Sequence, residues 1–337
     1  MDPEIERARH AVGIITRRAS LALFVVGTLF GSEAALAQSY PSRVITLVTT
    51  VPAGGSIDAV ARLLALALGK SLGQNVVVES RPGAGGNLAA GYVANAAPDG
   101  HTLLIGNSAT LTTNPHIYKS VPFDPEKSFA AVIIPARVNQ ILVINPKVPA
   151  SNLQEFIALM KAEPGKYNYG SSGIGASSHL AAEILGLQTG TRATHVPYRG
   201  IAPAILDLLA GRVDFVFDSA TTVQHVQSGN LRALAVVGPA NVAAIPNVKT
   251  FKELGVDGME VANSWYAVVA PAGTPHEIIR TLNAALTKIL EMPATMDAIR
   301  AMGLEPATST PEEMTESWAR ELKRLGTIVK KINIGPQ

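Results

Sequence analysis

Residues 44–70 read VITLVTTVPAGGSIDAVARLLALALGK, and this stretch decides the fold. Its first eight residues are mostly apolar and β-branched, which predicts a strand buried on both faces. After Ser56, in the predicted N-cap position, apolar residues recur at helical spacing. The turn between strand and helix, residues 52–55, directs free backbone N–H groups and the positive end of the helix dipole at one point. An anion would bind there without lysine or arginine. An ordinary strand–helix turn, with glycines for conformational reasons, explains the same pattern.

The N-terminus has the pattern of an export signal. Arg17 and Arg18 precede an apolar run, residues 21–30, and Ala35-Leu36-Ala37 forms an A-x-A cleavage site. We therefore predict that residues 1–37 are a secretory signal cleaved after Ala37; the arginine pair also fits the twin-arginine export route. The apolar run is too short for a membrane span, and no later stretch reaches the ~18 uninterrupted apolar residues that a span needs.

Composition excludes several classes of function. The chain has no cysteine, which excludes disulfides, cysteine nucleophiles and thiolate metal sites. Its formal net charge is +2 without any basic block, so nothing suggests nucleic acid as a partner. The seven histidines are scattered and lack zinc-ligand spacing. We predict neither a metal nor a cofactor.

Strand and helix patterns alternate along the chain, which predicts parallel, doubly wound α/β layers. The pattern lapses into Pro-rich polar chain over residues 111–129. We place a crossing into a second α/β unit near Val138 and a return on an apolar strand over residues 261–269. Helices are expected after this return at about 275–291, 294–302 and 311–331, the last opened by a capping box from Thr310 to Glu313.

Three polar turns follow predicted strands, at residues 52–56, 106–110 and 171–178. In open α/β sheets, ligands bind at the carboxyl ends of the strands. These turns are rich in Gly, Ser, Asn and Thr, which supply neutral hydrogen-bond donors. Asp218 also ends a predicted strand, where it would accept a hydrogen bond from a ligand or cap the expected helix 220–228. The sequence therefore predicts a ligand site built from strand ends.

Of four other side chains, Arg199 and Trp265 each have two interpretations. Arg199 would pair with a ligand carboxylate or form a solvated or interdomain ion pair. Trp265 would form a pocket wall or pack in the core. His179 follows a serine-rich turn and is expected to have a structural or capping role, and His195 is expected to be a core histidine.

An exported serine hydrolase is the alternative from another class. It would need a Gly-x-Ser-x-Gly elbow, which residues 106–109 and 170–173 approach without matching. Ser172 with His179 or His195 is the only candidate nucleophile–base pair. Residues 173–178 match part of a dinucleotide fingerprint but lack its third glycine. We therefore predict no catalytic residue and no enzyme.

A family resemblance extends over residues 41–332. It is carried, in order, by the segments PSRVITLV, PAGGSIDAVAR, VVVESRPGAGGN, AAPDGHTLLIGNS, NPHIYKSVPFDPEKSF, YGSSGIGASSHLAAE, HVPYRGIAPAILDLLAGRVDFVFD, LRALAV and WYAVVAPAGTP. These segments closely resemble the Bug family, the periplasmic substrate-binding receptors of tripartite tricarboxylate transporter systems. One departure is Thr49-Thr50-Val51, where the family usually has Val-Pro-Phe or Val-Pro-Tyr. The lost aromatic ring and gained hydroxyl would change the size or polarity of a pocket.

The resemblance implies a two-lobed periplasmic-binding-protein fold of type II, with lobe 1 made of residues 41–138 and 265–337 and lobe 2 of residues 139–264. It implies that backbone amides and ordered water, more than charged side chains, hold the ligand's carboxylate. It implies ligand-binding positions in five loops: Pro52, Ala53, Gly54, Gly55, Ser56, Asn107, Ser108, Ser172, Gly175, Ala176, Ser177, Arg199, Ala202 and Asp218.

The function implied is that of a receptor. Lobes close over a small carboxylate (a di- or tricarboxylate, an aromatic acid or an amino acid), which stabilises the closed form by bridging them. A monomeric periplasmic protein would then deliver this ligand to the membrane permease of a tripartite transporter. A receptor for a membrane signalling partner is the alternative that the sequence leaves open.

Overall fold

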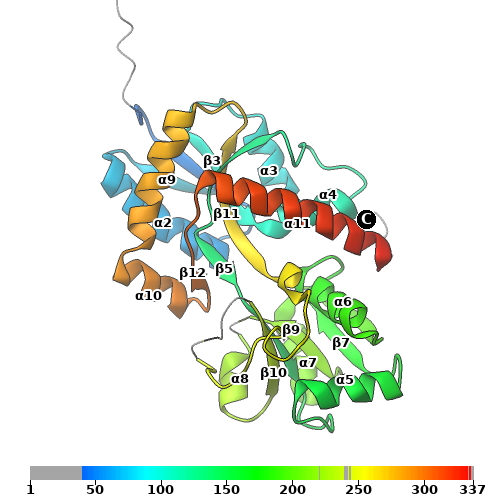
Figure 1. Cartoon of the computed structure of the whole chain (residues 1–337). Helices are drawn as coiled ribbons and strands as arrows, with labels where there is room; N and C mark the ends of the chain where they lie inside the picture. Colours follow the sequence, from blue (N-terminus) through cyan, green and yellow to red (C-terminus); the bar gives the residue numbers. More distant parts are fainter. Residues whose placement is uncertain (1–39, 220, 239–241, 243, 333, 335–337) are drawn as a thin grey trace, which may run out of the picture. The chain divides into compact units, whose positions relative to one another are not determined.

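The computed structural model describes residues 40–219, 221–238, 242, 244–332 and 334. The predicted export signal, residues 1–37, lies outside the described residues. Residues 43–337 form one compact unit, which contains all the strands and helices named below (Figure 1).

The first sheet has seven strands in the described chain. They are β1 (Ile45–Thr49), β2 (Val76–Ser80), β3 (Thr102–Asn107), β4 (Phe129–Ile133), β5 (Ala136–Val138), β11 (Ser264–Pro271) and β12 (Glu305–Pro306). Their order is β12-β5-β11-β3-β1-β2, and β4 also pairs with β11. Strands β2 and β3 both run parallel to β1, whereas β11 runs antiparallel to β3, β4 and β5.

The second sheet has five strands in the described chain, in the order β10-β6-β9-β7-β8. They are β6 (Gln140–Ile144), β7 (Asn168–Ser171), β8 (Thr194–Pro197), β9 (Phe215–Asp218) and β10 (Arg232–Val237). Strands β8 and β9 run parallel to β7, and β6 runs antiparallel to both of its neighbours.

The chain therefore leaves the first sheet between β5 and β6 and returns to it between β10 and β11. The predicted two-lobed α/β fold is confirmed, while the residue limits of the lobes stay a prediction. The prediction of wholly parallel sheets is wrong for the crossing strands. A strand that arrives from the other sheet needs no crossover helix, so it is free to pair antiparallel.

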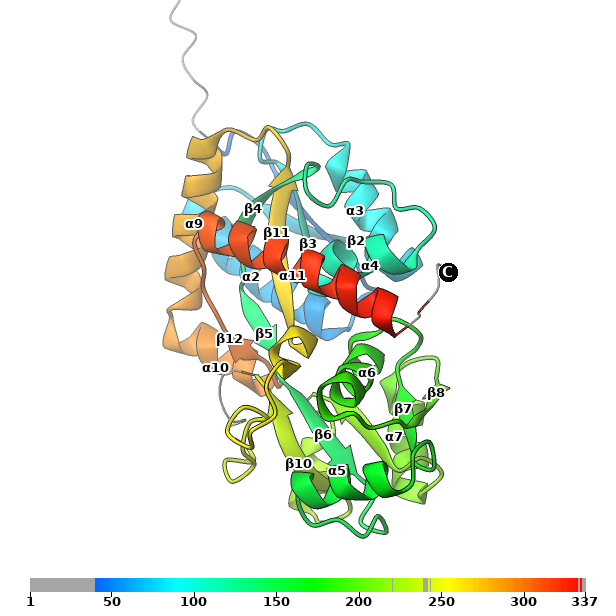
Figure 2. The ribbon, with the colours of Figure 1, turned by 45° about the vertical axis from the view of Figure 1, so that its right-hand side comes forward.

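Helices cover both faces of the first sheet (Figures 1 and 2). Helices α2 and α9 pack together on one face, while α3 and α11 share a core cluster with Val48, Leu104 and Trp265 on the other. These helices and their neighbours are α2 (Ser56–Leu72), α3 (Asn87–Ala94), α4 (Asn114–Ile117), α9 (His276–Leu290), α10 (Pro293–Ala301) and α11 (Pro311–Lys331), with the short turns η1 (Ala84–Gly86) and η2 (Ala109–Thr113).

The second sheet is covered in the same way. Phe156, Leu180 and Phe215 belong to the core on one face, and Ala204 and Val216 belong to the core on the other. The elements are α5 (Leu153–Ala162), α6 (Ser177–Thr189), α7 (Ile201–Ala210), α8 (Val223–Gln227) and η3 (Met259–Ala262). Among the described residues, no helix is both long and apolar enough to cross a membrane.

Helix starts follow their local sequence with one exception. The predicted capping box at α11 is present, with reciprocal bonds between Thr310 and Glu313. Ser56 is not the N-cap of α2, because Gly55 has the extended backbone of a cap (φ −79°, ψ 165°) and Ser56 is the first helical residue. Within residues 111–129, where the sequence predicted irregular chain, η2 is a π-helical turn followed by α4.

Candidate functional site

The turn after β1 presents unpaired backbone donors. Gly55 caps α2 without any side-chain hydrogen bond, and the Gly54 N–H donates to Asp58 Oδ2 at 3.0 Å. In the described chain, the N–H groups of Gly55, Ser56, Ile57 and Asp58 have no acceptor within the protein. Residues 52–56 are exposed. These donors lie at the positive end of a helix, so the turn has the geometry of an anion site.

An ion pair between a buried carboxylate and an exposed arginine supports this turn. The Asp58 side chain is almost fully buried, and both of its oxygens accept from Arg62, at 2.8 Å from Nε and 3.0 Å from Nη2. The hydrogen bonds from Arg62 and from the Gly54 N–H hold the pKa of Asp58 below its usual value. Arg62 thereby compensates the charge that would otherwise repel an anion from the turn. This ion pair was not predicted, although the i, i+4 spacing of Asp58 and Arg62 in the expected helix indicates it.

Asn107 lies on the same side of the first sheet as Ser56. It is paired with Tyr266 across the β3–β11 ladder, and the Tyr266 hydroxyl lies 2.6 Å from Ser56 Oγ. Asn107 Oδ1 accepts from both the N–H and the hydroxyl of Thr110, each at 3.1 Å. This fixes the carboxamide and leaves Nδ2 without an acceptor in the described chain, as a neutral donor. Tyr266 was not predicted as a site residue, although it follows Trp265 in the strand and alternation directs its side chain to the opposite face of the sheet.

Ser108 and Trp265 belong to a different cluster. The Trp265 indole N–H donates to Glu321 Oε2 of α11 at 2.5 Å, and Ser108 Oγ lies 3.3 Å from Ser264 Oγ. Thr112 also donates to the Glu321 carboxyl, at 3.1 Å. Trp265 packs in the core between the sheet and α11, which is the alternative interpretation of this residue. The structure does not bring Trp265 to the turn at residues 52–56.

In the second lobe, the loop at residues 171–178 is held by its own side chains. Ser172 N–H donates to Ser178 Oγ at 3.0 Å, and the two serine hydroxyls lie 3.2 Å apart. Gly175 N–H donates to His179 Nδ1 at 2.9 Å, which is the structural role expected of this histidine. Ala176 caps α6 without a side-chain bond. The N–H groups at the start of α6, those of residues 177–179, have no acceptor among the described residues.

Beside this loop, His179 of α6 and His195 of β8 stack on each other. Their ring centroids lie 3.9 Å apart, and Tyr169 stacks against His195 at 4.8 Å. Burial, with a smaller effect from His195, lowers the pKa of His179 to about 3, and burial also lowers the pKa of His195. His195 Nε2 lies 2.6 Å from Ser171 Oγ, whose residue is completely buried. Both rings are therefore neutral parts of the framework near neutral pH.

Gly175 and Ser177 lie where the lobes touch. Gly175 has φ +75°, and a Cβ on it would be 2.3 Å from Ile117 Cδ1 of the first lobe, so only glycine permits this approach. Ser177 and Ser108 line a cavity of about 20 Å³ between the lobes.

The remaining predicted residues lie at three loop ends. Arg199 is exposed and has no partner in the described chain, and Ala202 is exposed in the first turn of α7. Asp218 is buried, and its Oδ2 accepts from the Thr221 hydroxyl at 2.5 Å and from the Thr222 N–H at 2.9 Å. Asp218 is not the N-cap of α8, because the helix begins at Val223 and Thr222 is its N-cap, without a side-chain cap bond. Asp218 Oδ1 has no hydrogen bond within the described chain.

The departure from the family at residues 49–51 is visible in the packing. The buried Thr50 side chain lies between Gly86 and Gly106, and a Cβ on Gly106 would be 2.8 Å from Thr50 Cγ2. Thr50 Oγ1 has no hydrogen-bond partner in the part of the chain described. The Thr50 hydroxyl is therefore buried between these two glycines, beneath the start of α3.

Ten of the predicted residues fall into two groups in the structure. Residues 52–56 and Asn107 share one side of the first sheet, while Ser108, Gly175, Ser177 and Trp265 lie at or near the contact of the lobes. Among the described residues, no hydrogen bond joins the turn at 52–56 to the loops of the second lobe. No group of three His, Asp or Glu residues in the described chain is placed to hold a metal ion.

Comparison with known proteins identifies the family of the chain. Residues 60–334 match the model of the tripartite tricarboxylate transporter family receptor. Protein BugT of Bordetella pertussis is 37% identical over 297 residues, which cover 88% of this chain and 91% of BugT.

Two solved structures resemble the chain at similar identity. Rpa4515 of R. palustris, solved with adipate, has a TM-score of 0.75 at 34% identity and covers 88% of this chain and 100% of its own. MatC (Rpa3494) from Rhodopseudomonas palustris, solved with bound malate, has a TM-score of 0.71 at 30% identity and covers 86% and 100%. Since the family model spans most of the sequence and the relatives align over nearly their whole length, the chain belongs to the tripartite tricarboxylate transporter receptor family and is a solute-binding receptor.

Proposed function

We propose that this receptor captures a small dicarboxylate between its two lobes, with one carboxylate held by the backbone N–H groups at the start of α2. The observation that carries the proposal is the set of unpaired donors at Gly55, Ser56 and Ile57, at the end of a buried parallel strand. Asn107 Nδ2 adds a neutral donor on the same side of the sheet. Backbone amides stabilise a carboxylate through charge-assisted hydrogen bonds without a permanent positive charge nearby.

The second lobe offers a matching group. The free N–H groups at the start of α6 provide a second positive helix end, and Arg199 is an exposed cation two loops away. A ligand with negative charge at both ends satisfies both lobes at once and so favours their closure. Adipate and malate, the ligands named for the two similar structures, are both dicarboxylates.

The remaining elements of the proposal rest on family membership. The chain is exported by its N-terminal signal, acts in the periplasm as a monomer and hands its ligand to the permease of a tripartite transporter. A receptor that signals to a membrane partner would use the same site. A pull-down from membranes with the ligand-loaded protein separates these two roles: recovery of permease subunits supports transport, and recovery of a membrane sensor supports signalling.

Thermal unfolding of residues 38–337 with adipate or malate tests the ligand class. A ligand at 100 times its dissociation constant adds about 2.7 kcal/mol to the free energy of unfolding, which gives a measurable rise in melting temperature. Adipamide is the matched control, because it keeps the length of adipate and lacks both charges. A rise with adipamide equal to that with adipate, or no rise with any dicarboxylate when mass spectrometry shows an empty protein, contradicts the proposal.

The contacts give no support to ester hydrolysis. Ser172 Oγ bonds to Ser178, and His179 Nδ1 is already occupied by the Gly175 N–H. The serine that does contact a histidine, Ser171, is completely buried. A nucleophile must reach its substrate, so we propose that the chain is not an enzyme. Covalent labelling of either serine by a fluorophosphonate would contradict this.

A further inference from the structure

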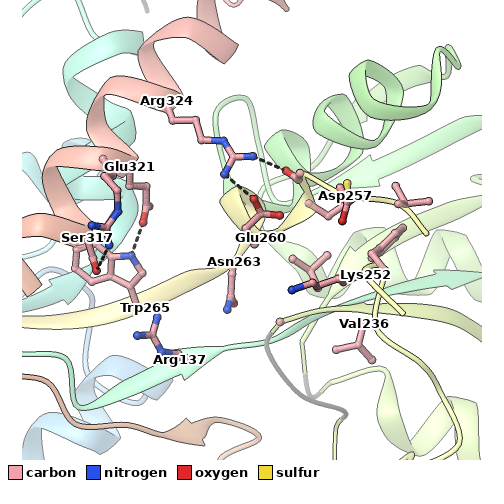
Figure 3. Close-up of a pocket in the computed structure, with 17 residues that line it drawn as sticks. Arg137, Val236, Lys252, Asp257, Glu260, Asn263, Trp265, Ser317, Glu321 and Arg324 are labelled. Carbon is pink, nitrogen blue, oxygen red and sulfur yellow. Dashed lines mark hydrogen bonds and ion pairs between the residues drawn. The ribbon is translucent and has the colours of Figure 1, made fainter. Parts of the chain in front are cut away.

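A second crevice lies on the α11 side of the crossing strands (Figure 3). Its volume is about 780 Å³, within the range of small-molecule sites. It is lined from the first lobe by β5, β11 and α11, and from the second by the end of β10 and the chain from Phe251 to Glu260. Of the residues predicted to bind the dicarboxylate, Trp265 alone lines it.

The floor of this crevice is apolar and its rim is charged. Trp265, Phe251 and Met259 are buried and form the floor together with the end of β10. The charged lining residues are Arg137, Lys252, Asp257, Glu260, Arg320, Glu321 and Arg324. An apolar floor with a few polar groups at the edge is the usual composition of a site for a small organic molecule.

Most of these charges already have partners. Arg324 forms an ion pair with Glu260 at 2.7 Å, joining the lobes across the crevice, and Arg320 lies 3.6 Å from Glu316. The Glu321 carboxyl accepts from Trp265. Burial raises its pKa to about 7, so this group is only partly ionised near neutral pH.

Arg137 alone among the cations that line the crevice is half-buried; Lys252, which also has no hydrogen bond or ion pair in the described chain, is exposed. Arg137 lies directly opposite Trp265 in the β5–β11 ladder. Within the described chain it makes no hydrogen bond and no ion pair, although its charge acts on the Glu321 carboxyl. Figure 3 shows its guanidinium group pointing into the crevice below Trp265. A half-buried guanidinium without a partner favours an anion, which it would bind through paired N–H groups.

Asn263 supplies a second polar contact. It lines the same crevice, its carboxamide points to the same space as Arg137 in Figure 3, and its Oδ1 is buried without a hydrogen bond in the described chain. Buried polar atoms normally have partners. The crevice thus offers a cation and an unsatisfied amide above an apolar floor.

We propose that this crevice is a second binding site, for a small organic acid with an apolar body, and that Arg137 anchors its carboxylate. The apolar body lies on Trp265, Phe251 and Met259. Because both lobes line the site, its occupant also contacts both sides of the crossing strands. The site is separate from the dicarboxylate site and does not depend on it.

Benzoate is the probe, and tryptophan fluorescence is the readout. Both tryptophans, Trp265 and Trp318, are buried in the core beside α11, but of the two only Trp265 lines the crevice. We expect a saturable change with benzoate, reached by about ten times a millimolar dissociation constant. Benzamide has the same shape without the charge and should bind at least about tenfold more weakly, the loss that accompanies one charge-assisted hydrogen bond.

Three variants locate the binding. Arg137→Gln should weaken benzoate binding by about tenfold or more, and Arg320→Gln, on the exposed rim, by a smaller factor. Arg280→Gln removes an exposed arginine of α9 that does not line the crevice and should change nothing. Circular dichroism confirms that each variant is folded.

Two outcomes overturn the proposal. One is the absence of a saturable benzoate signal in the unaltered protein. The other is benzoate binding that survives Arg137→Gln and disappears in Gly55→Asp, which assigns the benzoate to the dicarboxylate site. Failure of the dicarboxylates to bind would leave the benzoate result standing, so the two proposals are tested separately.

Discussion

Replacing Gly55 by aspartate should leave stability unchanged or slightly raised and, at the same time, strongly weaken carboxylate binding. Gly55 has φ −79°, and a Cβ there would meet Val51 Cγ2 at 3.6 Å and Pro52 O at 3.8 Å, so a side chain fits without strain. At the N-cap of α2, the introduced carboxylate accepts from the N–H groups of Ile57 or Asp58. These are donors that the proposed ligand needs, so the substitution places an internal competitor in the site.

The two effects differ in size. An N-cap aspartate in place of glycine is worth a few tenths of a kcal/mol, and its charge at the helix end adds about 0.3–1 kcal/mol, less the repulsion from Asp58. We therefore expect a melting temperature unchanged or raised by about 2 °C. A carboxylate that loses two charge-assisted bonds of about 1.5 kcal/mol each binds about 150-fold more weakly.

The assay is isothermal titration of adipate or malate into the unaltered protein and the variant, with melting temperatures measured on the same samples. Gly55→Asn is the matched control, because it caps the helix without a charge and should reduce affinity much less. If Gly55→Asp binds the dicarboxylate as tightly as the unaltered protein while Gly55→Asn behaves identically, the start of α2 is not the carboxylate site.

Three further predictions follow from the same geometry. Arg62→Gln leaves the charge of Asp58 uncompensated. Because Arg62 lowers the pKa of Asp58 in the folded state, the pair stabilises the protein above the unfolded-state pKa, and this stabilisation is lost as pH falls through the folded-state pKa. In urea unfolding the variant should therefore be less stable than the unaltered protein at pH 7 and equally stable in acid, and in titration at pH 7 it should bind dicarboxylate more weakly. Asn107→Asp keeps the Oδ1 acceptor but replaces the Nδ2 donor with negative charge, so adipate affinity measured by titration should fall about tenfold or more, whereas an unchanged affinity places Asn107 outside the site. The pKa of His179 is lowered to about 3 in the folded protein, so the free energy of unfolding should decline as pH falls below about 6.5, by at most about 1.4 kcal/mol per pH unit. His179→Asn retains an acceptor for the Gly175 N–H and should flatten this decline, as measured by urea unfolding at several pH values.

Local patterns predicted the elements that periodicity and capping specify. The capping box at Thr310 and the helix that follows it, α11, agree with the sequence. These features depend on residues close in sequence, so neighbouring side chains are sufficient to indicate them. The direction of β11 was not predictable in this way, because the pattern of an apolar strand is the same whether it pairs parallel or antiparallel.

The site was predictable as a set of loops but not as a set of contacts. Gly54, Gly55 and Ser56 lie in the turn that the sequence indicated, yet the charge balance of that turn depends on Arg62, one helical turn beyond it. Trp265 was expected near the ligand, and alternation along β11 instead directs its neighbour Tyr266 toward Ser56. Moving one residue along a strand moves the side chain to the other face of the sheet, and a sequence alone does not show the strand pairing that decides which residue faces the site.

The proposed site also explains why a receptor would use helix ends in place of arginines. The starts of α2 and α6 each carry about half a positive charge, so an empty closed cleft would bring two like partial charges together. These like partial charges repel each other, which favours the open form slightly. A dicarboxylate reverses the sign, because each carboxylate is attracted by about 0.3–1 kcal/mol to its helix end in addition to its hydrogen bonds. Closure then depends on a ligand with charge at both ends, and a monocarboxylate of similar size should bind one lobe and close the receptor poorly.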